Sequence, residues 1–134
     1  MVHPDDRRWS QANGAPVSWA HPISAGTRQR LLVAGLDPDA VAALVRAAVA
    51  EDLDGGIDVT ATATVPADQR GRAVFAARAS GTVAGLPVAA AVIDVVCGDA
   101  ASIDQLVADG TRVARGDELM NVDAPTRQLL TAEL

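Results

Sequence analysis

Residues 107–133 read "VADGTRVARGDELMNVDAPTRQLLTAE", and the pattern of this stretch changes part-way along. In the first half, apolar and polar residues alternate around two Gly turns, Asp109-Gly110 and Arg115-Gly116. This alternation predicts a tight β-hairpin. The inward positions of the predicted hairpin are Val113, Leu119 and Val122, and the positions facing water are Arg112, Arg115 and Asp117.

The second half of the same stretch predicts a helix. Asp123 is followed two residues later by Pro125, which is typical of a helix start. Leu129, Leu130 and Glu133 then follow at helical spacing. We expect Leu129 and Leu130 to be exposed unless another domain or subunit covers them, so the isolated chain is predicted to self-associate or to be poorly soluble.

Composition limits the class of protein. The chain has 134 residues, which suits one domain with an ordinary core. Apolar residues make up 49% and aromatic residues only 2%, so the core must consist mainly of Ala, Val and Leu. The net charge is −6, every base is a scattered arginine, and a nucleic-acid surface is therefore not expected. The longest apolar run, "AGLPVAAAVIDVVC", is too short to cross a bilayer, so no membrane segment is expected.

Cys97 is the single cysteine, which excludes an internal disulfide and a cysteine zinc cluster. It is interpreted as a small buried apolar residue, because no nearby base would lower the pKa of its thiol for a nucleophilic role. The start of the chain shows no secretory signal pattern, so a cytoplasmic location is expected.

Residues 1–36 show neither helical nor strand periodicity, and repeated Pro and Gly residues interrupt them. We interpret them as a disordered extension, in which "TRQRLLVAGL" could form a short helical turn. Trp9 and Trp19 are interpreted as partly exposed, with docking on a neighbouring surface as the alternative. His3 and His21 lack a carboxylate or cysteine at ligand spacing, so ordinary solvent-exposed side chains are expected.

A definite helix is predicted over residues 37–52. Asp37 suits the cap, Pro38 the first helical position, and Asp39 the positive helix end. The two glycines at 55–56 suit the helix exit. The apolar positions of this amphipathic helix recur at helical spacing and are Val41, Leu44, Val45, Ala48 and Val49.

The middle of the chain predicts two short strands and a second helix. Residues 71–85 alternate on either side of Ser80-Gly81, with Ala73, Phe75 and Ala77 on one face. Residues 102–107 supply a further strand. Residues 87–97 predict a helix, although its β-branched residues lower helix propensity. The expected apolar face of that helix is Val88, Ala91, Val92, Val95 and Val96.

Four carboxylates, Glu51, Asp52, Asp54 and Asp58, fall within eight positions. They could form a site for a hard cation, but they lack the regular spacing of calcium loops. We therefore interpret them as helix-end and loop carboxylates, whose short Asp side chains bond nearby backbone.

Several motifs together resemble the quinolinate phosphoribosyltransferase family, also called nicotinate-nucleotide pyrophosphorylase (carboxylating). They occur in the family's order, from Asp37 to Glu133: "EDL" at 51–53, "DVT" at 58–60, "VP" at 65–66, "GTVAG" at 81–85, and the hairpin followed by "APTRQLLTAE" at 124–133. The resemblance implies an α+β domain at 37–134, an α/β sandwich of the family's N-terminal type. Its hairpin is also similar to the barrel-sandwich hairpin of biotinyl and lipoyl domains.

The resemblance also implies what the rest of such an enzyme supplies. The family joins quinolinate to phosphoribosyl pyrophosphate, giving nicotinate mononucleotide, pyrophosphate and carbon dioxide, and the complete enzyme uses Mg²⁺. Family members are about twice as long, and a C-terminal barrel, absent here, holds most substrate contacts. The expected partner is the barrel domain of the same or another subunit in a homo-oligomer. No cofactor is expected in this chain.

The family's N-terminal substrate arginine directly follows Thr-Ala-Glu, which matches residues 131–133 here, whereas position 134 is leucine. No catalytic or metal-ligating residue is therefore expected in this chain. Arg127 is the nearest cation on the predicted helix, and we interpret it as a structural or interface residue, with a substrate contact as the alternative. We expect an inactive N-terminal fragment of the enzyme.

Two other functions remain alternatives. A lipoyl or biotinyl carrier is disfavoured because the sequence has no lysine, and Thr126 occupies the position where the modified lysine would lie. A non-catalytic interaction domain derived from the family is the second alternative. Its apolar surface would bind a full-length relative.

Overall fold

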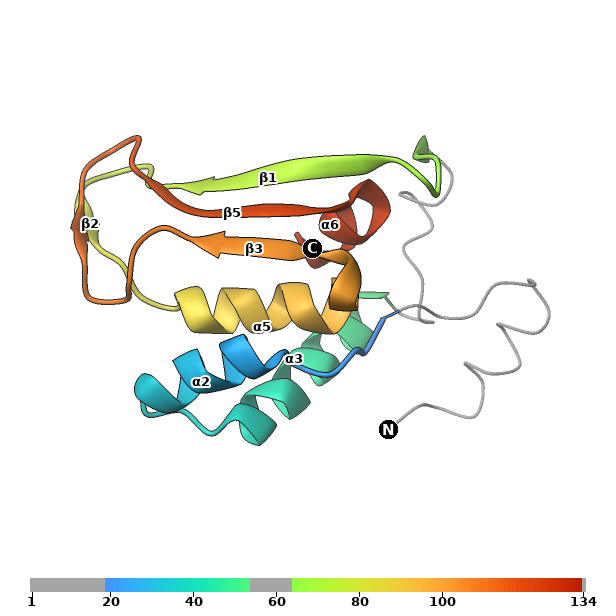
Figure 1. The fold of residues 1–134 in the computed structure, drawn as a ribbon, viewed down its shortest axis with the longest axis horizontal. Coiled ribbons are helices and arrows are strands. Elements are labelled where there is room, and N and C mark those ends of the chain that lie inside the picture. Colours follow the sequence, from blue (N-terminus) through green and yellow to red (C-terminus); the bar gives the residue numbers. More distant parts are fainter. Residues whose placement is uncertain (1–18, 54–63, 134) are drawn as a thin grey trace.

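The computed structural model describes residues 19–53 and 64–133 (Figure 1). Residues 1–18, 54–63 and 134, which include His3, Trp9 and the predicted "DVT" motif, lie outside the described residues. The described elements follow one another in the order α2 (Ala25–Val33), α3 (Pro38–Leu53), β1 (Arg70–Ala76), β2 (Gly81–Thr82), α5 (Leu86–Cys97), a 3-10 turn (Gly98–Ala100), β3 (Ser102–Gln105), β4 (Arg112–Val113), β5 (Glu118–Pro125) and α6 (Thr126–Ala132).

The elements are arranged as layers around α5. An antiparallel sheet with the strand order β1-β5-β3 lies on one side of this helix, and α2 and α3 lie on the other (Figure 1). Helix α6 contacts α5 and also contacts β1 and β5. The mixed helix and sheet architecture confirms the α+β class predicted from the sequence.

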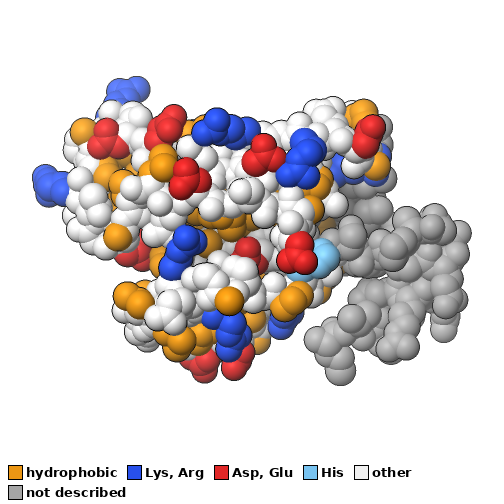
Figure 2. All heavy atoms as spheres, viewed as in Figure 1, with side chains coloured by type: hydrophobic (Ala, Val, Ile, Leu, Met, Phe, Trp, Pro, Cys, Tyr) orange, Lys and Arg blue, Asp and Glu red, His pale blue; other side chains and the backbone are white. Residues whose placement is uncertain are grey.

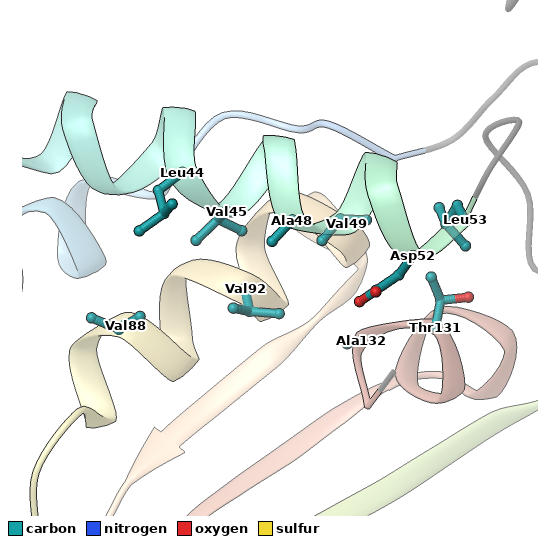
Figure 3. Close-up of a pocket in the computed structure, with 10 residues that line it drawn as sticks. All are labelled: Leu44, Val45, Ala48, Val49, Asp52, Leu53, Val88, Val92, Thr131 and Ala132. Atoms are coloured by element: carbon teal, nitrogen blue, oxygen red, sulfur yellow. The ribbon is translucent and has the colours of Figure 1, made fainter.

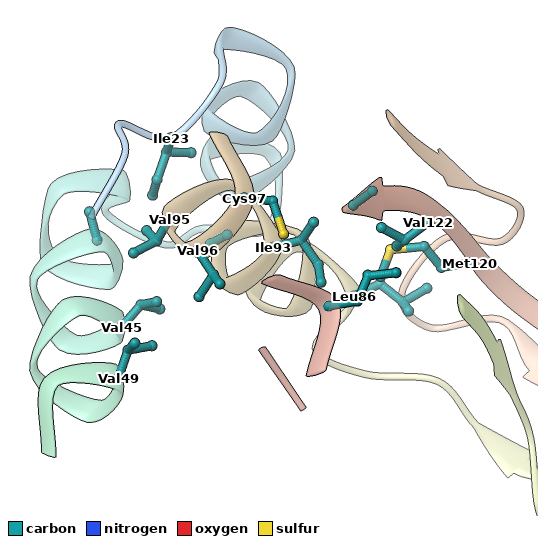
Figure 4. Packing of buried hydrophobic residues seen from close by; sticks show 14 of the residues in the cluster. Ile23, Val45, Val49, Leu86, Ile93, Val95, Val96, Cys97, Met120 and Val122 are labelled. Carbon is teal, nitrogen blue, oxygen red and sulfur yellow. The ribbon is translucent and has the colours of Figure 1, made fainter. Parts of the chain in front are cut away.

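Helix α5 is the centre of the core. Its sequence, "LPVAAAVIDVVC", is apolar on nearly every side, as expected of a helix surrounded by protein. The prediction of a single apolar face was therefore too narrow. Residues on its other sides, such as Ile93 and Cys97, are also buried, while Val88 and Val92 of the predicted face are only half-buried. Figure 4 shows Ile93, Cys97, Met120 and Val122 packed between this helix and the sheet.

Helix α3 confirms the prediction for residues 37–52. The Asp37 Oδ1 accepts a hydrogen bond of 3.0 Å from the Asp39 backbone N–H, which satisfies a free donor at the helix start. The helix buries Val45 and Val49 against the core, whereas Leu44 remains 70% exposed.

Strand β1 alternates between half-buried and exposed residues, so the predicted face with Ala73, Phe75 and Ala77 is confirmed. Strand β5 lies between β1 and β3 and turns Met120 and Val122 towards the same side. The strand predicted over 102–107 is present as β3, although it is shorter at its end.

The predicted pairing of the hairpin is wrong. Strand β4 pairs with β2, through Gly81 opposite Val113, and β5 pairs instead with β1 and β3. Because β5 lies at the centre of a sheet, its backbone groups are satisfied on both edges, which a two-stranded hairpin could not achieve.

The facing of the hairpin residues was nevertheless predicted correctly, because Val113, Leu119 and Val122 all belong to the core or pack against it. A shift in the register of the β1–β5 pairing opposite Leu119 allows all three side chains to face the core. Phe75 pairs with Met120 and the next residue of β1 pairs with Glu118. The extra residue of this β-bulge places Leu119 on the core side although it lies three positions before Val122.

Two details of the predicted C-terminal helix are corrected. Asp123 is still in strand β5, where the Arg70 guanidinium contacts its carboxylate at 2.7 Å, and α6 begins only after Pro125. Leu129 is only 6% exposed, not exposed as predicted, because it packs beside Gly71 of β1. Leu130 is 38% exposed and agrees with the prediction.

The predicted disordered extension is corrected over residues 19–36. This part contains α2, a full helix and not only a turn, whose Leu31 is completely buried. His21 is also not an ordinary exposed side chain. It is half-buried, its backbone N–H donates to the Val95 carbonyl at 2.8 Å, and its ring lies beside Gly98. Trp19 is partly buried against the core, as its interpretation expected.

Candidate functional site

The N-terminal half of α6 is hydrogen-bonded to the segment that leads into β1. The Thr126 backbone N–H donates to the Gln69 carbonyl at 2.9 Å. The helix approaches β1 closely at Gly71, where an added Cβ would lie only 2.9 Å from the Thr126 Oγ1. Gly71 therefore permits a helix-to-strand contact that any other residue would disturb.

Arg127 forms a second hydrogen bond between the same helix and the segment before β1. Its Nε donates a hydrogen bond to the Val65 carbonyl, and Val65 belongs to the "VP" motif before β1. One nitrogen of its guanidinium is therefore engaged within the chain. This contact joins α6 to the segment that precedes β1.

A groove with a volume of about 300 Å³ lies between α3, α5 and α6 (Figure 3). Its side chains are mostly apolar, and Asp52 is the only charged residue among those lining it. Its lining comprises Leu44, Val45, Ala48, Val49, Asp52 and Leu53 from α3, Val88 and Val92 from α5, and Thr131 and Ala132 from α6.

A second hollow of about 390 Å³ lies between α5 and the strands β1, β2 and β4. Phe75, Leu86, Val113 and Leu119 are among the side chains that line it, and none of its lining residues is charged. Neither hollow has the concentrated positive charge that a phosphate or dicarboxylate would need.

The arginines of the described chain are dispersed or engaged. Arg28 contacts Asp39 at 3.0 Å, and Arg70 contacts Asp123 and the Ala100 carbonyl. Figure 2 shows blue and red side chains intermingled across the face in view. Over the ranges 19–53 and 64–133, no group of three or more His, Cys, Asp and Glu could hold a metal ion. Asp54 and Asp58 of the predicted carboxylate set lie outside these ranges.

Cys97 is buried, in agreement with its interpretation as an apolar core residue. Burial raises the pKa of its thiol to about 11, and the neighbouring Asp94 carboxylate adds to the rise. At neutral pH the thiol is therefore protonated, which argues against a nucleophile. No helix in the described part of the chain has both the length and the apolar character needed to cross a membrane.

Sequence reasoning missed two carboxylates that join distant elements. Asp109, interpreted only as a turn residue, accepts hydrogen bonds of 3.0 Å from the backbone N–H groups of Gly85 and Leu86 at the start of α5. Asp94, to which the sequence assigned no role, lies within the apolar helix α5 and accepts two hydrogen bonds from Ser24. An acid inside an apolar helix was the available signal for Asp94, because a buried carboxylate requires donors.

Comparison with known proteins identifies the domain. A sequence model of one protein family, described as "Quinolinate phosphoribosyl transferase, N-terminal domain", matches residues 58–134, more than half of the chain. The chain belongs to this family. The quinolinate phosphoribosyltransferase family is the one that the sequence motifs resemble.

Relatives of the quinolinate phosphoribosyltransferase family agree in sequence and in fold. The nicotinate-nucleotide pyrophosphorylase (carboxylating) of Mycobacterium leprae is 42% identical over 96 residues, which cover 71% of this chain and 34% of the relative. The structure of the nicotinate-nucleotide pyrophosphorylase from Francisella tularensis matches with a TM-score of 0.64 and 29% identity, over 71% of this chain and 33% of that one. NadC from Streptococcus pyogenes matches with a TM-score of 0.68 and 25% identity, over 73% of this chain and 34% of that one. This chain therefore matches about a third of the length of each relative.

Proposed function

We propose that this chain is the N-terminal part of a quinolinate phosphoribosyltransferase of NAD biosynthesis. The complete enzyme would join quinolinate to phosphoribosyl pyrophosphate and release nicotinate mononucleotide, pyrophosphate and carbon dioxide. The observation that carries this proposal is the family match over residues 58–134, together with the 42% identity to the Mycobacterium leprae relative. Because the matches cover about a third of each relative, the chain by itself is proposed to be inactive.

The charges of the described chain support the proposed inactivity. The reaction must hold two carboxylates, a phosphate and a pyrophosphate together while the sugar carbon becomes cationic, which calls for clustered cations. The groove between α3, α5 and α6 and the hollow between α5 and the strands are lined almost entirely by uncharged side chains, and the sequence has no lysine. The anion-binding groups would therefore come from further polypeptide.

Arg127 is proposed to act through the position of α6. Its hydrogen bond to the Val65 carbonyl supports a structural role over a substrate contact. By family resemblance, the substrate arginine directly follows Thr-Ala-Glu, and this chain has leucine at that position, 134. No cofactor is proposed for this chain, and Mg²⁺ would bind with phosphoribosyl pyrophosphate in the complete enzyme.

The proposed partner is a barrel domain, supplied by the same subunit or by another subunit of a homo-oligomer. The length of the relatives supports a further domain of this kind. A cytoplasmic location is proposed because the substrates are soluble metabolites. Nucleic acid is not a proposed partner, since the chain is acidic and its arginines are dispersed.

The test is formation of nicotinate mononucleotide from quinolinate and phosphoribosyl pyrophosphate with Mg²⁺. The purified chain should give no product above the background without protein. A separately produced barrel domain from a relative, mixed with this chain, should give measurable product that neither part gives alone. Turnover by the chain alone would contradict the proposed inactivity, and absence of product from every mixture would count against its enzymatic role.

A non-catalytic interaction domain is the second candidate, and the exposed Leu44 beside an apolar groove favours it. Sedimentation of the chain with a full-length relative distinguishes the two functions. A stable complex that leaves the relative's activity unchanged would support the interaction domain. Restored activity of a relative damaged in its N-terminal domain would support the enzyme part.

A further inference from the structure

Strand β1 lies at the edge of its sheet. It pairs with β5 on one side, and no strand of the described chain pairs with its other side (Figure 1). It is seven residues long and contains no proline, whereas β3, the strand at the opposite edge, has four residues. An edge strand presents unpaired N–H and C=O groups on which another strand can pair. The free side of β1 is therefore the longer of the two edges that this sheet leaves open.

The ladder with β5 shows which residues of β1 face the free edge. Hydrogen bonds of an antiparallel pair alternate along the strand. The Thr126 N–H donates to the Gln69 carbonyl at 2.9 Å, and these two residues continue the register of β1 with β5 by one pair. Every second residue after Gln69 therefore bonds to β5, and the intervening ones direct both backbone groups to the free edge. The residues that face the free edge are Arg70, Arg72, Val74 and Ala76.

This edge is complementary to itself. If a twofold axis passes at Ala73, Arg72 of one copy lies opposite Val74 of the other copy. In the same register Arg70 lies opposite Ala76. Each of these pairs joins two residues whose N–H and C=O groups face the edge, so each can exchange two hydrogen bonds. An antiparallel pairing of two β1 strands thus satisfies the open edges of both copies.

The arginines favour this register over its neighbours. An axis at Arg72 would place this residue opposite its own counterpart, and an axis at Val74 would place Arg70 opposite Arg78. Like charges directly opposite each other destabilise a strand pair. With the axis at Ala73, no arginine is directly opposite another arginine. Asp123 of each copy lies opposite Arg72 on β5 and offsets part of its charge.

The side chains of the two copies also fit together. Val74 is 47% exposed in the described chain, and the aliphatic stem of Arg72 from the other copy would cover it. On the core-facing side, the half-buried Phe75 lies opposite Gly71 of the other copy, so two bulky residues do not meet there. An aromatic residue opposite a glycine is a favourable pair in sheets.

We propose that the free edge of β1 is the docking surface for a second copy of this chain, which pairs through its own β1 in antiparallel orientation with the twofold axis at Ala73. The paired strands are about 24 Å long. Such a contact is smaller than the about 800 Å² that each partner of a stable complex buries, so the dimer exchanges with the single chain. This inference goes beyond the proposed function and involves no substrate.

Cysteine cross-linking tests the register. Arg72→Cys and Val74→Cys are made in separate full chains, and the two variants are mixed under mild oxidation. In the proposed dimer these two positions lie about 5.5 Å apart at Cα, within reach of a disulfide, whereas identical positions lie about 7–8 Å apart. The mixture should therefore cross-link about tenfold faster than either variant alone. Cys97 is present in every sample and is buried.

A third variant controls for random collisions. Ser102→Cys carries its thiol on an exposed position of β3, away from the free edge of β1. Its mixture with Arg72→Cys should cross-link no faster than the separate variants. Equal cross-linking of Arg72→Cys and Val74→Cys whether mixed or separate would overturn the proposal, and so would equally fast cross-linking of the control mixture.

A proline variant tests the edge independently of the thiols. The Val74 N–H faces the free edge, so Val74→Pro removes a donor from this edge and keeps the hydrogen bonds to β5. Val74→Thr is the matched control, because it keeps the N–H. Sedimentation should give a mass that rises with concentration towards two chains for the unchanged protein and for Val74→Thr, but a constant mass for Val74→Pro.

Circular dichroism shows whether Val74→Pro is folded, and the cross-linking decides the question if it is not. A mass of one chain at every concentration of the unchanged protein would overturn the proposal. Association of folded Val74→Pro equal to that of the unchanged protein would also overturn it, because another surface would then join the copies. Neither measurement involves quinolinate, so failure here is separate from failure of the proposed enzymatic role.

Discussion

Helices α5 and α2 lie against each other, but different forces hold them. Helix α5 is apolar on nearly all sides and is enclosed by the sheet and the other helices. Helix α2, "AGTRQRLLV", has few apolar residues, and Leu31 is its completely buried one. A helix such as α5 has to be buried wherever the chain places it, whereas α2 depends on specific contacts with its neighbour.

The contacts of α2 converge on Asp94 of α5. This buried carboxylate accepts hydrogen bonds from the Ser24 backbone N–H at 3.1 Å and from the Ser24 Oγ at 2.9 Å. The same Ser24 Oγ accepts from the Thr27 N–H at 3.2 Å and so caps α2. The carboxylate of Asp94 thus accepts hydrogen bonds from the residue that caps α2, which lies 70 residues earlier in the sequence.

The largest effect is expected from the core of α5. Ile93→Ala removes a side chain that is only 4% exposed and leaves a cavity, so the free energy of unfolding should fall by about 2–5 kcal/mol. Urea unfolding monitored by circular dichroism measures this change. A change below about 1 kcal/mol would show that α5 is not the centre of the core.

The second effect is a loss of stability at alkaline pH. The pKa of the Cys97 thiol is 9.0 ordinarily and about 11 in the folded chain, mainly because of burial. Between these values the unfolded chain releases a proton that the folded chain keeps, so stability is complete below pH 9 and falls as pH rises towards 11. The fall should amount to about 2–3 kcal/mol by linkage.

Unfolding measurements at pH 8 and pH 11 test this dependence. Cys97→Ala removes the thiol, so the part of the fall caused by this group should disappear in that variant. A pH profile that is the same with and without the thiol would contradict the assignment.

The third effect should be confined to α2. Asp94→Ala leaves the Ser24 N–H without its acceptor and removes one of the two acceptors of the Ser24 hydroxyl, which should cost about 1–3 kcal/mol. Hydrogen exchange should become faster for the amides of α2 than for those of α5. Ser24→Ala in the same background should add only the loss of the cap on the Thr27 N–H, about 0.5–2 kcal/mol, because the interaction between Ser24 and Asp94 is already absent. Equal acceleration in both helices would remove the distinction drawn between them.

The smallest effect is expected on the outer side of α2. Leu32 is 57% exposed, so Leu32→Ser should change the free energy of unfolding by no more than about 0.5 kcal/mol. Thermal unfolding compared with Ile93→Ala provides the measurement. A large loss would indicate that an additional contact covers this side of α2 in solution.

Local patterns predicted the elements whose signal lies within a few neighbouring residues. The cap of α3, the burial of its Val45 and Val49, and the alternation of β1 were predicted from the sequence, because a local pattern separates the polar from the buried side of one element. Leu44 was expected on the buried side of α3 and is exposed. The family motifs also predicted the fold class. The candidate site was less predictable, since Arg127 was singled out but its acceptor, the Val65 carbonyl, lies 62 residues away.

The sequence by itself determined that this chain has an aromatic-poor aliphatic core, a helix over residues 87–97 and no concentrated cations. The tertiary structure decided that β4 pairs with β2, that α2 belongs to the domain, that Leu129 is buried, and that α3, α5 and α6 enclose a groove. The reason is that side-chain polarity specifies which face of an element is buried. The choice of the neighbour that buries it depends on contacts between residues far apart in the chain.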